Sequence, residues 1–549
     1  MSTQSSDSAV SPQTVASPAP LGVGEAATPA ESAILANPVA ASATPESAAK
    51  TTSKQIRGSS LMMVGRIISI AINFASQVVV VRYLGKADFG AFAYALSMAA
   101  LLQSVVALGL DRVDTRFLSL YDERGDYPRL FGILLLELAT IASLGTVAFT
   151  AVVVLRNALA GALIDDRLAV SLLCILVLMA PLQAFDNLVM NIFAVFAKPR
   201  AVFVRRFLLE PALRFSVILI LVVAGLPVRF LAGGWVAAAV IGLGLYAAIL
   251  VRLLRETGLL ARFDRRSLIV PAREAFAFSL PLLTTNFVYV FTTSLGAVVL
   301  GSFDGSAAVA SFRAVQPVAA LNNLVMTSFT VLFTPVASRL FARADKAGMR
   351  DLYWQTSAWL AVLSFPMLLA TTSLARPVTT LLFGERYEGS ATYLILMSIG
   401  YYLTAAIGFN GTILQIVGRL RFVVVTNLVV VVFAAVADVV CIALWGALGA
   451  AIAVLAVYFV HNLLKQLGLG GDVGVGLFDI RYSFTYATLA AAFVISMAVM
   501  ILLDPPLILG LVLVAIVTAV LFMLNRRMLR VEETFPELLR LPLLGRLLR

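Results

Sequence analysis

The feature that most constrains this chain is the alternation of long apolar runs with short charged segments. Fourteen runs of roughly twenty residues follow one another between about residues 59 and 525. A helix of that length crosses the ~30 Å hydrocarbon core of a bilayer. Of the 549 residues, 60% are hydrophobic and 13% are charged. A chain of this composition has too few polar residues to cover the surface of a soluble protein. We therefore predict a polytopic membrane protein.

The predicted fold is all-α, with about 14 transmembrane helices. The expected spans lie near 59–81, 89–110, 129–155, 168–196, 205–225, 229–251, 275–301, 307–337, 353–373, 391–415, 421–442, 444–464, 482–503 and 506–525. Leu84-Gly85 ends the first span and Leu300-Gly301 ends the seventh, which is a weak internal repeat. Because six helices separate the two copies, we expect two pseudo-symmetric six-helix bundles of the same orientation, plus two C-terminal helices.

This repeat divides the chain into six predicted segments. The first 53 residues are rich in Ala, Ser, Pro and Thr and contain no aromatic residue, which is typical of disorder. Leu and Arg alternate irregularly after the last span, as in helices that lie at a membrane surface. The expected segments are a disordered cytoplasmic tail (1–56), an N-terminal six-helix bundle (57–255), a cytoplasmic linker (256–274), a C-terminal six-helix bundle (275–466), helices 13 and 14 (467–527) and a cytoplasmic amphipathic tail (528–549).

The distribution of Lys and Arg predicts which loops face the cytoplasm. Of the 41 basic residues, 31 fall on the alternate segments that include both termini, seven fall on the other loops, and three lie within spans. Positive residues near span ends stay in the cytoplasm. Both termini are therefore predicted to be cytoplasmic, in a multi-pass protein of the bacterial cytoplasmic (inner) membrane that contacts anionic lipids.

Several function classes are disfavoured by the sequence. The net charge of +11 is explained by topology, and no stretch interleaves basic and aromatic residues as a nucleic-acid site would. A single histidine excludes a zinc site of the HExxH type, and Gly85-Lys86 lacks the rest of a Walker motif. Asp165-Asp166 resembles a metal-binding pair, but its place just before a span favours a helix N-cap. The outer loops are short, which disfavours a glycosyltransferase or polymerase. We expect no cofactor and no catalytic residue.

Charged residues inside predicted spans are the strongest candidates for function. Each costs on the order of 2.5–3.5 kcal/mol in the bilayer and therefore tends to face a cavity or a partner. The candidates are Arg66, Arg214 and Arg313 for substrate binding, and Glu137, Asp186 and Asp438 for ion coupling. Simpler roles remain open: Glu210 and Arg214 have the i,i+4 spacing of an internal ion pair, and Arg66, Arg313 and Asp438 lie near span ends, where they can reach water.

Neutral polar residues extend this candidate site. Gln183, Asn187 and Asn191 recur every fourth residue beside Asp186, so one helix carries a polar stripe that should face protein or water. Interhelical hydrogen bonds would explain many such residues without any ligand. The neutral residues predicted to bind substrate are Asn73, Gln77, Asn187 and Asn286.

Two short segments resemble those of a known family. The segment from Arg82 to Gly90 (RYLGKADFG), followed by Tyr94-Ala95 and Gly109-Leu110, resembles the opening helical hairpin of Wzx-type polysaccharide flippases in the MOP superfamily. The segment from Leu382 to Tyr387 (LFGERY) resembles the one found before span ten in those proteins. The resemblance covers about residues 57–549.

The resemblance implies a carrier that moves a polyprenyl-pyrophosphate-linked oligosaccharide to the outer leaflet by alternating access, for exopolysaccharide, capsule or O-antigen biosynthesis. Na⁺ or H⁺ coupling and contact with polymerase and co-polymerase proteins of an export pathway are further hypotheses. A lipid II flippase and a MATE-type drug/cation antiporter are the nearest alternatives. The three intramembrane arginines favour an anionic cargo over a cationic drug.

Overall fold

The computed structural model describes residues 65–110, 113–162, 166–195, 202–470 and 473–530. These residues form helices joined by short turns, and among them there is no β-strand. The predicted all-α fold is confirmed. The tail expected at 1–56 lies outside the described residues, as does most of the amphipathic tail expected at 528–549.

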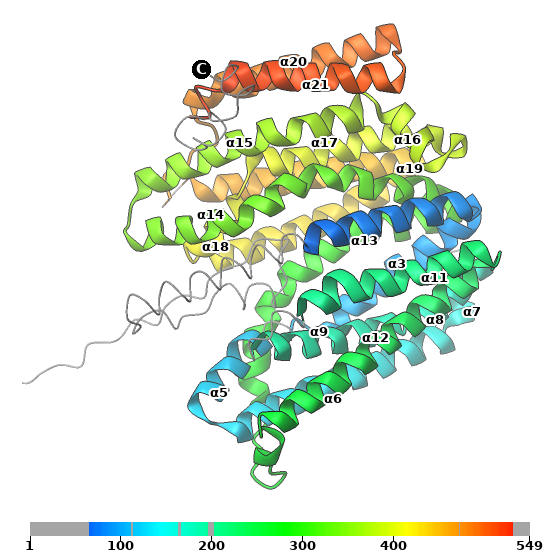
Figure 1. The fold of residues 1–549 in the computed structure, drawn as a ribbon, viewed down its shortest axis with the longest axis vertical. Coiled ribbons are helices and arrows are strands. Elements are labelled where there is room, and N and C mark those ends of the chain that lie inside the picture. Colours follow the sequence, from blue (N-terminus) through cyan, green and yellow to red (C-terminus); the bar gives the residue numbers. More distant parts are fainter. Residues whose placement is uncertain (1–64, 111–112, 163–165, 196–201, 471–472, 531–549) are drawn as a thin grey trace, which may run out of the picture.

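The N-terminal half of the described chain forms one group of helices, drawn in the lower part of Figure 1. It consists of the Gly65–Tyr83 helix, α3 (Lys86–Ala107), η2 (Asp114–Leu118), α5 (Ser119–Arg124), α6 (Tyr127–Val154), α7 (Arg156–Ala162), α8 (Arg167–Leu176), α9 (Met179–Val195), η3 (Val204–Leu209), α11 (Glu210–Val223), α12 (Val228–Glu256) and η4 (Leu260–Arg262). We call this group the N-lobe.

The C-terminal half forms the second group, in the upper part of Figure 1. It consists of α13 (Ala272–Ala320), η5 (Leu321–Asn323), α14 (Leu324–Ala342), α15 (Lys346–Thr372), α16 (Ala375–Phe383), η6 (Glu385–Ser390), α17 (Ala391–Ile407), α18 (Asn410–Ile416), α19 (Leu420–Leu469), η7 (Ile480–Tyr482), α20 (Ser483–Leu503) and α21 (Leu507–Asn525). We call this group the C-lobe. The boundaries of the six predicted segments stay predictions.

Ten of the described helices are long and apolar enough to cross a membrane, and α15 with α16, bent by 70°, brings the number to eleven. Two helices are far longer than one crossing needs, because α13 has 49 residues and α19 has 50. Each is interrupted by a glycine with positive φ, at Gly305 (φ 76°) and Gly446 (φ 55°). The count of fourteen spans stays a prediction.

The interruption at Gly446 reverses the chain. A Cβ atom on Gly449 would lie 1.9 Å from the carbonyl oxygen of Cys441, whereas residues eight apart in a straight helix are separated by ~12 Å. The two halves of α19 therefore lie side by side and coincide with the predicted spans 421–442 and 444–464. Glycine suits this position because it adopts φ > 0 without steric cost.

The lobes share hydrophobic cores along α13. α13 packs against α3 of the N-lobe as well as against α17 and α19 of its own lobe. The cluster at this seam combines Phe89 of the N-lobe with Phe312 and Tyr387 of the C-lobe. Other large clusters belong to the N-lobe with the start of α13, or to the C-lobe alone. The seam is thus closed at the end that includes the start of α3 and η6.

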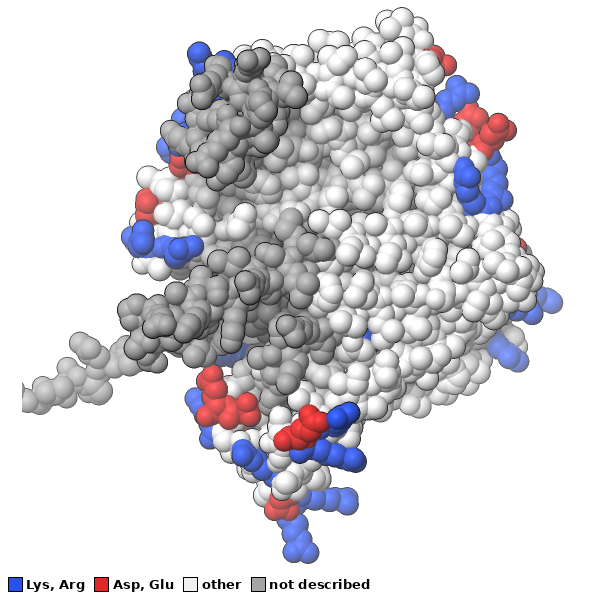
Figure 2. All heavy atoms as spheres, viewed as in Figure 1, with Lys and Arg blue, Asp and Glu red and all other residues white. Residues whose placement is uncertain are grey.

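Charged side chains gather at opposite ends of the molecule. Figure 2 shows Lys, Arg, Asp and Glu at the left and lower-left edges and at the right edge, with a face between them almost free of charge. Leucine, isoleucine and valine side chains are exposed on the apolar helices, among them Leu219 on α11, Ile241 on α12 and Val432 on α19. An apolar belt between two charged ends is what a bilayer requires. Together with the long apolar helices, it identifies a multi-pass membrane protein.

Candidate functional site

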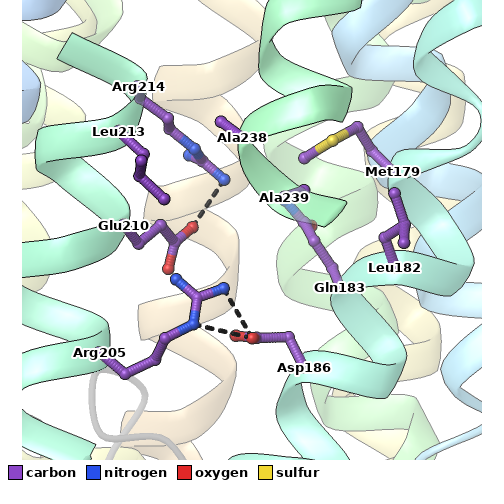
Figure 3. Close-up of a pocket in the computed structure, with 10 residues that line it drawn as sticks. All are labelled: Met179, Leu182, Gln183, Asp186, Arg205, Glu210, Leu213, Arg214, Ala238 and Ala239. Carbon is purple, nitrogen blue, oxygen red and sulfur yellow. Dashed lines mark hydrogen bonds and ion pairs between the residues drawn. The ribbon is translucent and has the colours of Figure 1, made fainter. Parts of the chain in front are cut away.

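The N-lobe contains a polar pocket between α9, η3, α11 and α12, which Figure 3 shows in close-up. Its lining is Met179, Leu182, Gln183, Asp186, Arg205, Glu210, Leu213, Arg214, Ala238 and Ala239. Two arginines and two carboxylates therefore lie together among apolar residues. The sequence predicted a polar stripe of Gln183, Asn187 and Asn191 beside Asp186. Gln183 and Asp186 line this pocket, whereas Asn187 is exposed and Asn191 donates a hydrogen bond to Asp114.

Arg205 and Asp186 form the deepest ion pair of this pocket. The Nε and Nη2 atoms of Arg205 donate to Oδ1 of Asp186 at 3.0 and 2.7 Å. The Arg205 side chain is 4% exposed and that of Asp186 is 18% exposed. Figure 3 shows the two side chains pointing toward each other from neighbouring helices. Such a pair avoids an isolated buried charge, which would be very costly.

A glycine on α12 leaves space in the pocket for the Arg205 side chain. A Cβ atom on Gly242 of α12 would lie 2.9 Å from Nη2 and 3.0 Å from Cζ of Arg205. One turn further along α12, the Tyr246 ring lies 5.7 Å from the guanidinium carbon. Gly242 thus provides the space that the guanidinium occupies, and Tyr246 provides a cation–π contact.

The second ion pair joins neighbouring turns of α11. Nη2 of Arg214 lies 2.7 Å from Oε1 of Glu210, which confirms the pairing expected from their i,i+4 spacing. The Arg214 guanidinium also lies 5.2 Å from the Trp235 ring on α12. The Arg214 side chain is 24% exposed, so it is more accessible than Arg205.

Arg313 lies at the seam between the lobes. Its Nη1 donates to Oε1 of Gln316 at 2.5 Å, one turn further along α13. Its Nη2 donates to the hydroxyl of Ser97 on α3, which belongs to the other lobe. An arginine that bridges α3 and α13 is positioned where a relative movement of the lobes would change its contacts.

The candidate acids lie in three separate places. Asp438 on α19 is 3% exposed, and its Oδ1 would be 3.2 Å from a Cβ atom on Gly296 of α13. Glu137 on α6 is 4% exposed. Asp186 forms the ion pair with Arg205. The structure therefore does not gather the three acids into one site.

The other predicted residues lie on three helices. Arg66 is the second residue of the Gly65–Tyr83 helix and is half-buried, as is Gln77 on the same helix. Asn73 is exposed and bonds Ser69 of its own helix at 3.2 Å, and Asn187 on α9 is exposed. Asn286 is on α13, and its side chain lies outside the described set.

The sequence predicted that Asp165-Asp166 caps the helix that follows, and the structure confirms this for Asp166. Oδ1 of Asp166 accepts hydrogen bonds from the backbone N–H groups of Leu168 (2.8 Å) and Ala169 (3.3 Å), which is an N-cap. Its other carboxylate oxygen accepts a hydrogen bond from Ser306 of α13. Asp165 lies outside the described residues.

Two basic residues that the charge count assigned to cytoplasmic loops are in fact buried. Arg205 is 3% exposed and Lys465 is 5% exposed. Lys465 lies near the end of α19 beside Gly411, whose Cβ atom would be 3.3 Å from Nζ. A charge count places a residue near a span end but does not reveal which helix covers it. In the sequence, only the polar stripe on α9 indicated that this helix needs a charged partner such as Arg205.

Solved structures of membrane transporters have a similar fold. The lipid II flippase MurJ in an inward closed conformation has a TM-score of 0.64 and 14% identity, over 85% of this chain and 99% of that chain. An inward-facing multidrug resistance MATE family transporter of the MOP superfamily has a TM-score of 0.59 and 15% identity, over 74% and 94%. A MOP superfamily transporter from Pyrococcus furiosus Vc1 (DSM3638) has a TM-score of 0.53 and 15% identity, over 82% and 96%. These identities show a shared fold.

Sequence comparison supplies the family. The teichuronic acid biosynthesis protein TuaB of Bacillus subtilis (strain 168) is 23% identical over 159 residues, which are 29% of this chain and 32% of that protein. The chain thus aligns with about a third of this relative's length. Residues 56–341, just over half of the chain, match the family described as polysaccharide biosynthesis protein. The protein therefore belongs to the polysaccharide biosynthesis protein family and has the fold of the MOP superfamily, as the RYLGKADFG and LFGERY segments predicted.

Proposed function

We propose that this protein is a flippase that moves a polyprenyl-pyrophosphate-linked oligosaccharide across the cytoplasmic membrane by alternating access of its two lobes. Its family and its fold support a membrane transporter in polysaccharide biosynthesis. The proposal assigns no catalytic residue, because flipping neither makes nor breaks a covalent bond. Membrane lipids surround the apolar belt, and polymerase and co-polymerase proteins are the expected neighbours in the pathway.

The observation that carries this proposal is the position of Arg313. Its guanidinium donates a hydrogen bond to Ser97 on α3, so it lies within α13 between the two lobes. A guanidinium presents five donors in a rigid fork that matches phosphate oxygens. In the proposed cycle, lobe movement releases Arg313 from Ser97, and the diphosphate of the cargo replaces the hydroxyl as its acceptor.

The charge of the cargo also supplies a driving force. An inside-negative potential favours outward movement of negative charge by about 2.3 kcal/mol per charge per 100 mV. The prenyl chain remains in lipid while the head group crosses between the lobes. Arg66 and Arg214 are proposed as further contacts of the anionic head group, and Asn73, Gln77, Asn187 and Asn286 as contacts of the sugars.

Reconstitution in liposomes tests the proposed cargo. We expect purified protein to transfer a labelled polyprenyl-pyrophosphate oligosaccharide between leaflets, with an outward bias when the potential is inside-negative. Empty liposomes are the background control, while lipid II and a cationic dye test the two alternatives. Efflux of the dye without transfer of the oligosaccharide lipid would replace this proposal with an antiporter.

Asp438 is our first candidate for ion coupling, because among the described groups it forms no ion pair and is 3% exposed. Gly296 leaves space beside its carboxylate. Glu137 is the second candidate, and Asp186 the third because Arg205 already neutralises it. We expect Asp438→Asn to abolish the response of transport to a Na⁺ or H⁺ gradient while transport driven by the potential persists. An unchanged response in this variant would exclude Asp438 from coupling.

A further inference from the structure

The two sequence segments that carried the family resemblance contact each other in space. Nε of Arg82, at the end of the Gly65–Tyr83 helix, donates to the carbonyl oxygen of Leu382 at 2.9 Å, and its Nη2 donates to the carbonyl oxygen of Leu381. In return, Nη2 of Arg386 on η6 donates to the carbonyl oxygens of Val81 (2.6 Å) and Arg82 (2.8 Å). Each segment thus has one arginine whose guanidinium donates hydrogen bonds to backbone carbonyl oxygens of the other segment.

Each arginine comes from a different lobe. The Gly65–Tyr83 helix belongs to the N-lobe: its first residue lies against Phe203 and Phe207, and the Tyr83 hydroxyl donates to the carbonyl oxygen of Leu226 at 3.4 Å. η6 lies between α16 and α17 of the C-lobe. The four hydrogen bonds therefore cross between the lobes, about 300 residues apart in sequence.

An aromatic contact reinforces the same junction. Tyr387, next to Arg386, is fully buried. Its ring lies 5.4 Å from the guanidinium carbon of Arg386 and 5.6 Å from Nζ of Lys86, which is the first residue of α3 in the N-lobe. The Tyr387 ring thus makes a cation–π contact with one residue from each lobe. The hydrogen bond from Ser306 of α13 to Asp166 of the N-lobe is another link between the lobes.

These contacts lie at the end of the seam that includes the start of α3 and η6, which the distribution of Lys and Arg assigns to the outer side. We propose that Arg82 and Arg386 form an outer clasp that keeps the transport path closed to the outside and must open to release cargo. The proposal rests on the transport function, but its first test needs no cargo.

The chemistry of the clasp suits a reversible closure. Both arginine side chains are exposed, and their acceptors are backbone carbonyl oxygens. When the lobes separate, water can satisfy both the guanidinium groups and the carbonyl groups, so opening leaves no charge in an apolar environment. Each guanidinium also bridges two successive carbonyl groups, a geometry that lysine does not reproduce.

The clasp can be tested by measuring the distance between the outer ends of the lobes. In a Cys174→Ser, Cys441→Ser background, spin labels at Arg229→Cys and Asp504→Cys report on exposed positions of the N-lobe and C-lobe. Double electron–electron resonance in lipid nanodiscs gives the populations of short and long distances. We expect the double variant Arg82→Ala, Arg386→Ala to raise the ratio of long to short distances at least tenfold. Arg82→Lys, Arg386→Lys should give a smaller increase.

Two controls separate opening from other effects. Arg376 is also an exposed arginine near η6, but it pairs with Glu388 within its own lobe, so Arg376→Ala should leave the ratio unchanged. A label pair inside the N-lobe, at Arg156→Cys and Arg229→Cys, should keep its distance in every folded variant. An unchanged distribution in a folded Arg82→Ala, Arg386→Ala protein would overturn the clasp. If the double variant raises the ratio of long to short distances but the protein transfers no lipid-linked oligosaccharide, the clasp proposal stands and the proposed cargo is rejected.

Discussion

Replacing Arg313 by alanine is expected to lower the rate of lipid-linked oligosaccharide transfer by about 10- to 100-fold. A charge-assisted hydrogen bond contributes about 1.5–3 kcal/mol, and each 1.4 kcal/mol corresponds to a factor of ten. In our proposal the diphosphate of the cargo loses this interaction when the guanidinium is removed. The measurement is leaflet transfer in liposomes at equal protein content and equal thermal stability.

Three comparison variants isolate the role of Arg313. Arg313→Lys keeps the charge without the fork and should retain part of the activity. Ser97→Ala removes the acceptor across the seam but leaves the guanidinium, so its effect should be much smaller. Arg229→Ala removes an exposed arginine of the N-lobe and should have none. Normal transfer by a well-folded Arg313→Ala protein would remove this residue from substrate binding.

Breaking the Arg205–Asp186 pair is expected to have the largest effect on stability. Removing one partner of a buried ion pair leaves the other charge uncompensated and costs about 3–5 kcal/mol. We expect Arg205→Met and Asp186→Leu each to lower the free energy of unfolding by this order. The double variant should lose less than the sum, because neither charge then remains buried. Unfolding in mixed detergent micelles measures all three values.

An exposed pair of the same protein serves as the control for this cycle. Arg252 and Glu256 on α12 lie 2.8 Å apart, with side chains 82% and 60% exposed. Exposed i,i+4 pairs contribute about 0.3–0.5 kcal/mol, so Arg252→Met should change stability little. If Arg205→Met is no more destabilising than Arg252→Met, the pocket pair has no structural role.

Gly242 offers a second perturbation of the same ion pair without removing a charge. Gly242→Ala places a methyl group where the Arg205 guanidinium lies and should cost about 1–3 kcal/mol, as overpacking does. Gly244 is on the same helix with no atom within 4 Å of its Cβ position, so Gly244→Ala should be neutral or stabilising. Thermal unfolding of the two proteins makes the comparison. Equal stability would mean that Arg205 moves aside at no cost.

The features that were predicted correctly depend on local sequence. Glu210 and Arg214 are four residues apart, so helix geometry alone brings them together. Asp166 precedes α8 directly and can cap it whatever else packs nearby. The spans predicted at 421–442 and 444–464 correspond to the two halves of α19 on either side of Gly446. Each of these inferences uses at most a few turns of helix.

Contacts between distant segments could not be predicted in this way. Arg205 appeared to belong to a loop, and only the packing of η3 between α9 and α12 places it beside Asp186 and Gly242. The candidate residues Arg66, Asn73 and Asp438 share a polar character inside spans, yet Arg66 and Asn73 lie on the Gly65–Tyr83 helix and Asp438 lies on α19 of the other lobe. Charge inside a span indicates that a partner is needed, but it does not identify the partner.

By itself the sequence determined that this chain crosses a membrane many times, which side its loops are expected to face, and which family its two short segments resemble. Those properties follow from the cost of placing charge and backbone polar groups in hydrocarbon, which every residue meets locally. Only the tertiary structure decided that Arg82 and Arg386 meet across the lobes and that Arg313 lies at the seam. These contacts depend on how helices pack, and many packings satisfy the same pattern of hydrophobicity.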